Sequence, residues 1–183
     1  PGGRLGTFFE LTTALALKWF LEQRVQVAVL ETGMGGRLDS TNVVTPLVSV
    51  ITEIGLEHTG FLGDTLEKVA AEKAGIVKPG RPVVVGRQKP AAAKIIEAKA
   101  AEAGAPLVRA GERVSVKRLS QDLDGQILSI ETSDGAWAPF RLPLLGDFQL
   151  NNCALAIAAL EWLRDSLSLP LPPLRRQPDT HPP

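Results

Sequence analysis

Three residues whose side chains can do chemistry lie in the first half of the chain, and two of them follow apolar segments. Glu31 ends the short apolar run Val25–Leu30, and His58 follows a second run, Val48–Ile54, after a short loop. If both runs are strands of a parallel sheet, a carboxylate and an imidazole lie along one edge of it. Open α/β folds bind their ligands at that edge, so the sequence predicts a ligand site there.

Lys73 is the third candidate. A helix is predicted over Thr65–Ala74, with Asp64 and Glu67 as a capping box and Gly75 as its end, and Lys73 falls in the middle of its apolar face. Desolvation lowers the pKa of a lysine and leaves a neutral amine that can act as a nucleophile or be carbamylated by carbon dioxide. Alternatively, Lys73 extends past the apolar face to solvent or meets carbonyl groups at the end of the helix. Helical geometry alone leaves both interpretations open.

The rest of the chain alternates strands and helices, which predicts an α/β fold with a mostly parallel sheet flanked by helices. Further predicted elements are a capped helix from Thr7 to about Gln23, a strand Arg81–Val85, a helix Pro90–Ala103, a strand Pro106–Arg109, a small antiparallel β meander Arg113–Leu142 and a helix Cys153–Leu163. The expected core residues of the first helix are Phe8, Leu11, Leu15, Trp19 and Phe20. We assign residues 1–165 to one domain and the proline-rich residues 166–183 to a disordered tail.

Composition excludes several classes of protein. The chain of 183 residues is 44% hydrophobic and has no net charge, with 20 basic and 20 acidic residues and no block of like charge. This balance argues against a nucleic-acid or membrane surface. Its single cysteine, Cys153, lies in an apolar run and is expected to be a small core residue. Without a signal peptide or a long apolar span, the expectation is a cytoplasmic protein, and we expect a monomer.

Two sequence segments carry a resemblance to a known family. The segments LETGMGGRLDSTN and TEIGLEHTGFLGDTLEKVAAEKAGIVKPG resemble the folylpolyglutamate synthase and dihydrofolate synthase family of the Mur ligase superfamily. The resemblance implies the central domain of these enzymes, which is P-loop NTPase-like. It also implies that Glu31 and His58 are magnesium ligands and that Lys73 is carbamylated and supports a second metal ion. A carbamate supplies oxygen donors, which suit Mg²⁺, and Glu57 stands where the family usually has aspartate.

A later segment also resembles the family. Gly146, Gln149 and Asn152 are similar to its residues near the adenine of bound ATP. Glutamine and asparagine each carry a donor and an acceptor that can match an adenine edge. The alternative is a helix cap, because Asn151 and Asn152 precede the predicted helix.

The implied activity is that of an ATP-dependent ligase. ATP phosphorylates a carboxylate of folate or dihydropteroate, and the amine of L-glutamate attacks the acyl phosphate. The implied cofactors are ATP and Mg²⁺. The chain contains no Walker motif, so we expect a fragment without its upstream P-loop and without activity as an isolated chain.

Parts of the sequence suggest three other functions. A Mur-type ligase of peptidoglycan precursors is disfavoured by the segment GMGGRLDSTN. A nicotinamide-dependent oxidoreductase is suggested by Gly33 and Gly35 after a strand, but Leu38 stands where the third glycine is needed. A non-catalytic remnant, or a module that only binds metal or a partner, remains open.

Overall fold

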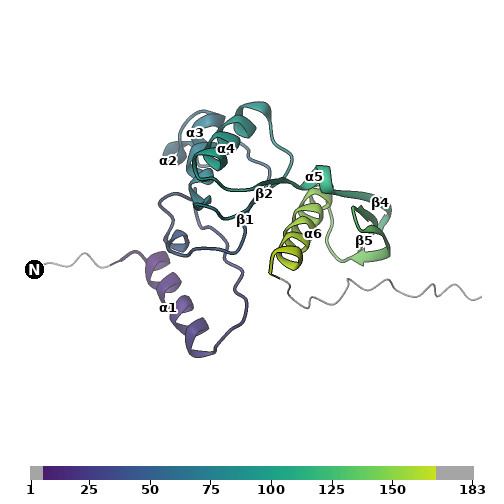
Figure 1. Ribbon diagram of the computed structural model, residues 1–183, viewed down its shortest axis with the longest axis horizontal. Coiled ribbons are helices and arrows are strands. Elements are labelled where there is room, and N and C mark those ends of the chain that lie inside the picture. The colour runs from purple at the N-terminus through teal and green to yellow at the C-terminus, as the bar shows by residue number, and fades with distance from the viewer. Residues whose placement is uncertain (1–5, 168–183) are drawn as a thin grey trace, which may run out of the picture.

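A parallel sheet of three short strands lies at the centre of the fold (Figure 1). The computed structural model describes residues 6–167. The strands are β1 (Ser49–Ile51), β2 (Val83–Val85) and β3 (Leu107–Arg109), in that spatial order. Val83 of β2 lies opposite Ser49 on one side and Leu107 on the other. Each strand falls within a predicted one, and the predicted parallel α/β arrangement is confirmed.

Helices cover both faces of this sheet. One face packs against α2 (Thr59–Leu62), α3 (Leu66–Lys73), the 3₁₀ turn η2 (Ala74–Ile76) and α4 (Pro90–Glu102). The core on this side includes Ile51, Val69, Val83, Val85 and Ile96. Because β2 is buried on both faces, it consists of three consecutive valines, as expected for a strand between two helical layers.

The second face packs against the C-terminal half of the chain. Its elements are α5 (Ala110–Arg113), β4 (Val114–Asp122), β5 (Gly125–Thr132), β6 (Gly135–Leu142) and α6 (Phe148–Leu167). The three strands form the predicted antiparallel meander, in the order β4-β5-β6. Val84 and Val108 join Ile130 of the meander and Leu155 and Ala158 of α6 in a second core. Cys153 packs against this core, as predicted, and burial raises the pKa of its thiol.

The first helix, α1 (Phe8–Glu22), forms as predicted but is not packed as predicted. Its capping box is present, with the Thr7 amide 2.6 Å from Glu10 Oε2 and the Glu10 amide 3.2 Å from Thr7 Oγ1. The expected core residues are largely exposed: Phe8 83%, Leu11 57%, Leu15 66% and Trp19 57%, with Phe20 half-buried. Helical periodicity places these residues on the helix, but only a neighbouring element can bury them.

The predicted strand Val25–Leu30 is wrong for this structure. The segment has no regular secondary structure, and Val27 and Val29 are 69% and 92% exposed. A strand is stable only where a neighbour completes its hydrogen bonds, and within residues 6–167 β1 pairs with β2 alone. Glu31 therefore follows an extended apolar segment that is outside the sheet.

Two predicted helix boundaries differ from the structure. The N-cap of α3 is Thr65, whose hydroxyl accepts a hydrogen bond from the Lys68 amide at 3.3 Å. Asp64 instead pairs with the Lys68 ammonium at 2.8 Å. The last helix starts at Phe148, five positions before the predicted Cys153, and continues to Leu167, past the predicted domain boundary. The rest of the predicted tail lies outside the described residues.

Truncation of a buried and of an exposed apolar side chain should change the stability by different amounts. We expect Ile96→Ala to lower the free energy of unfolding by about 2–4 kcal/mol, because Ile96 is 1% exposed in the core between α4 and the sheet. The matched control, Leu15→Ala on α1, is expected to change it by less than about 0.5 kcal/mol. Urea denaturation followed by circular dichroism measures both. Equal effects of the two substitutions would contradict this assignment of the core.

Candidate functional site

The loop after Glu31 lies against the carboxyl end of α3. The Arg37 amide donates to the Glu72 carbonyl oxygen at 2.8 Å, and the Arg37 guanidinium pairs with the Glu72 carboxylate at 2.9 Å. Gly36 makes this approach possible, because a Cβ there would lie 2.8 Å from the Glu72 carbonyl oxygen and 2.9 Å from that of Lys73. The loop that carries Glu31 is thus fixed beside the turn that carries Lys73.

Asp39 holds the same loop in shape. Its Oδ1 accepts from the Thr41 amide at 3.0 Å and from the Thr41 hydroxyl at 2.6 Å, and its Oδ2 accepts from the Met34 amide at 2.9 Å. Partial burial alone would raise the pKa of Asp39. The hydrogen bonds from Thr41, Met34 and Gly33 outweigh burial, so the pKa lies below its ordinary value.

Asn42 completes the attachment of the loop. Its side-chain amide donates to the carbonyl oxygens of Arg37 and Gly75, each at 3.1 Å, and its own carbonyl accepts from Lys78 Nζ at 2.8 Å. The end of the segment GMGGRLDSTN therefore serves mainly to dock one loop on the α3–η2 region. The sequence of this segment indicates the family, but it does not indicate which hydrogen bonds Asp39 and Asn42 make.

His58 is exposed and precedes the single helical turn of α2. Its backbone is left-handed, with φ 49°, a conformation that is uncommon for residues other than glycine. Its carbonyl accepts hydrogen bonds from the amides of Phe61 at 2.8 Å and Leu62 at 3.0 Å. These bonds fix the backbone of the loop that presents the imidazole.

Lys73 meets the His58 loop through Glu57. The Lys73 Nζ lies 2.6 Å from Glu57 Oε1, and the Lys73 side chain is 26% exposed. The Lys73 side chain is therefore partly exposed and paired with Glu57, and it is not buried in the middle of the apolar face of α3. Its carbamylation stays a prediction. The hydrogen bond and the charge of Lys73 hold the pKa of the Glu57 carboxyl below its ordinary value.

The structure thus places the loop after Glu31 and the loop that carries His58 against the end of α3 that carries Lys73. Lys73 and the residue before His58 form an ion pair, and the loop after Glu31 docks on Glu72. Glu31 itself is exposed. Within residues 6–167 no three or more His, Cys, Asp or Glu side chains form a group that could hold a metal ion.

Gln88, which sequence analysis missed, ties together the carboxyl ends of β1 and β2. Its Oε1 accepts from the Ile54 amide at 3.1 Å, and its Nε2 donates to the Thr52 carbonyl oxygen at 2.7 Å. An amide side chain can form this pair of bonds because it has one acceptor and one donor group, like a peptide unit. The available signal in the sequence is a polar residue three positions after an apolar strand.

Gln149 and Asn152 lie in the first turns of α6. Asn152 Nδ2 donates to Gln149 Oε1 at 3.1 Å, so the two side chains lie next to each other. The alternative in which Asn151 and Asn152 cap the helix is wrong, because α6 already begins at Phe148. Their predicted contact with adenine stays a prediction.

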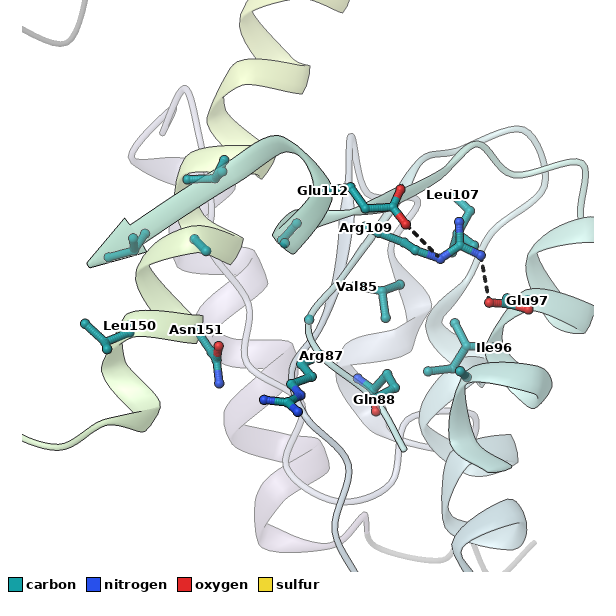
Figure 2. A pocket seen from close by; sticks show the side chains of 17 residues that line it. Val85, Arg87, Gln88, Ile96, Glu97, Leu107, Arg109, Glu112, Leu150 and Asn151 are labelled. Atoms are coloured by element: carbon teal, nitrogen blue, oxygen red, sulfur yellow. Dashed lines mark hydrogen bonds and ion pairs between the residues drawn. The ribbon is translucent and has the colours of Figure 1, made fainter. Parts of the chain in front are cut away.

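A pocket of about 440 Å³ opens at the carboxyl ends of β2 and β3, between α4, α5 and α6 (Figure 2). Its polar residues include Arg87, Gln88, Arg109 and Asn151. The Arg109 guanidinium pairs with Glu97 at 2.7 Å and lies 3.9 Å from Glu112. Sequence analysis did not predict this pocket, because its walls come from segments far apart in the chain.

Comparison with known proteins decides the family. Residues 3–160 match the Mur ligase middle domain. The chain belongs to this family. Folylpolyglutamate synthase of Lacticaseibacillus casei is 42% identical over 167 residues, which are 91% of this chain and 39% of that protein. The chain thus spans about two fifths of the length of this curated relative.

Solved structures of Mur ligase family members agree with the fold. An FPGS–AMPPCP–folate complex is 42% identical, with a TM-score of 0.86, over 91% of this chain and 40% of that one. Mycobacterium tuberculosis folylpolyglutamate synthase complexed with ADP and AMPPCP is 38% identical, with a TM-score of 0.76, over 84% and 36%. In the described part of this family member, no helix has the length and apolarity needed to cross a membrane.

The Asp39 contacts predict a loss of stability that depends on pH. Asp39→Ala should lower the free energy of unfolding by about 1–2 kcal/mol at pH 7. The Met34 amide, the Thr41 amide and the Thr41 hydroxyl all lose their acceptor in this variant. Since the pKa of Asp39 is depressed in the fold, its stabilisation exists above the ordinary aspartate pKa of about 3.9. It disappears as the pH falls through the lowered value.

Urea titrations of parent and variant at several pH values measure this difference in stability. Asp64→Ala is the control, because Asp64 forms an exposed surface pair with Lys68 and is expected to contribute less than about 0.5 kcal/mol. Equal stability of parent and Asp39→Ala at pH 7, or a difference that grows on acidification, would contradict the assigned role.

Proposed function

We propose that this chain is the middle domain of an ATP-dependent ligase that adds L-glutamate to folate or dihydropteroate. The observation that carries the proposal is the similarity, at 42% identity, to a folylpolyglutamate synthase and to a structure of such an enzyme with AMPPCP and folate. The site geometry supports it, because the segments of Glu31, His58 and Lys73 come to one end of α3.

In this proposal Glu31, His58 and carbamylated Lys73 hold Mg²⁺. The donor set fits a hard cation in part, with an exposed carboxylate and an exposed imidazole, and the carbamate adds the oxygen donor that a lysine lacks. The bound ion would offset charge on the phosphoryl group. Glu57 would release Lys73 from its ion pair when the carbamate forms, because two neighbouring anions repel each other without a cation between them.

The remaining residues of the proposed site position the reactants. Gln149 and Asn152 would bind the adenine edge of ATP, with their amides already held side by side. The chemistry would be phosphorylation of a substrate carboxylate by ATP and then attack by the glutamate amine, with release of ADP and phosphate. The expectation of a cytoplasmic monomer belongs to the same proposal.

For the isolated chain we propose a domain without ligase activity. Although the loop after Glu31 is docked on α3, Glu31 itself follows the exposed segment 25–30 outside the sheet, and within residues 6–167 its carboxylate makes no hydrogen bond or ion pair. Catalysis that depends on positioning loses most of its rate when no contact orients one of the groups. An assay of ATP consumption by the isolated chain with folate and glutamate should give no activity above the buffer.

In the full-length ligase that contains this chain, we expect Glu31→Gln and His58→Ala each to lower the turnover number by at least about a hundredfold, because a cation ligand is lost. The matched control is Glu67→Gln, the same change on the exposed side of the first turn of α3, where turnover should stay within about twofold of the parent. Release of phosphate dependent on ATP, folate and glutamate is the measurement. Near-normal turnover of His58→Ala at saturating magnesium would refute the assignment.

A further inference from the structure

The pocket between β2, β3 and α6 combines an apolar floor with few polar groups. Val85, Ile96, Val114 and Ala154 contribute to its walls and are each less than 9% exposed. A volume of about 440 Å³ falls in the range of sites that bind small molecules. An apolar ring buried against this floor would supply most of the binding free energy.

Arg87 is the cation of this pocket that is available to a ligand. Within the described residues, its guanidinium makes no ion pair and no hydrogen bond, and Figure 2 shows it directed toward the side of the pocket that Asn151 lines. Arg109 lines the same pocket but is already paired with Glu97. A free guanidinium presents a planar pair of donors that matches a carboxylate.

The charges around the pocket limit the ligand to one anionic group. Glu97 and Glu112 lie on the Arg109 side of it and would repel a second anion (Figure 2). Asn151, from α6, adds an exposed amide whose side chain has no hydrogen bond within residues 6–167. Such an amide can match a donor or an acceptor at the edge of a ring.

This pocket is distinct from the proposed adenine contacts. At about 100° per residue, Asn151 and Ala154 lie within about 60° of each other on α6. Asn152 lies about 100° and Gln149 about 160° from Asn151 around the same helix, so both face away from the pocket. Neither Gln149 nor Asn152 lines it.

We propose that this pocket is a second binding site, for a small molecule with a flat apolar ring and a single carboxylate. The carboxylate pairs with Arg87, the ring lies over Val85 and Ile96, and its polar edge meets Asn151. The site is independent of the ligase reaction proposed above, and its test needs no ATP, metal or folate.

The test is a titration of the ¹⁵N-labelled chain with 1-naphthoate, followed by NMR. Saturable shifts are expected in the backbone amides of residues 86–88, 110–112 and 150–152. Arg87→Met should weaken binding about tenfold, because a charge-assisted hydrogen bond is lost. The neutral analogue 1-naphthamide should bind the parent about as weakly as 1-naphthoate binds the variant.

The matched control is Arg81→Met. Arg81 is exposed, lies in the loop before β2 and does not line the pocket, so its loss should leave the affinity unchanged. Because Arg87 is also exposed, its variant should keep the spectrum of the folded parent. Equal affinity of parent and Arg87→Met, the absence of saturable shifts, or shifts confined to the exposed apolar side of α1 would overturn the proposal.

Discussion

The parallel pairing of β1, β2 and β3 is the constraint on which the rest of the structure depends. It places the carboxyl ends of the three strands at one edge, where the loop of His58, the residues Arg87 and Gln88, and the start of α5 emerge. Parallel strands require crossover connections, and these supply the helices α3 and α4 on one face. The proposed metal site and the pocket that Arg87 lines both follow from this arrangement. The metal site lies after β1, and the pocket lies at the ends of β2 and β3.

Most of the fold could be predicted from local signals. The valine run of β2, the capping box of α1 and the Asp-Gly turns of the meander each report the conformation of a few neighbouring residues, and the structure confirms these elements. The family could also be predicted, because the residues of each motif are contiguous in the chain. Each of these signals depends only on neighbouring residues in the sequence and not on the position of a distant segment.

The wrong predictions depend on such distant segments. Leu15 and Trp19 of α1 have a helical spacing of apolar residues, and Val27 and Val29 have the composition of a strand, but a surface is buried only if another element covers it. Helical geometry left open whether Lys73 is buried on the apolar face of α3 or extends past it, because its partner, Glu57, lies sixteen positions earlier. The pocket that Arg87 lines could not be predicted for the same reason, since α4, α5 and α6 meet only in the folded chain.

The bonds of Gln88 have a mechanical consequence. Its side chain holds the Thr52 carbonyl and the Ile54 amide as a neighbouring peptide group would, so it extends the sheet beyond the last paired residues of β1 and β2. The backbone that leads into His58 is therefore clamped to the residue next to Arg87. Thr52 and Ile54 precede His58 by six and four residues, so the position of the Gln88 side chain sets where the His58 loop leaves the sheet.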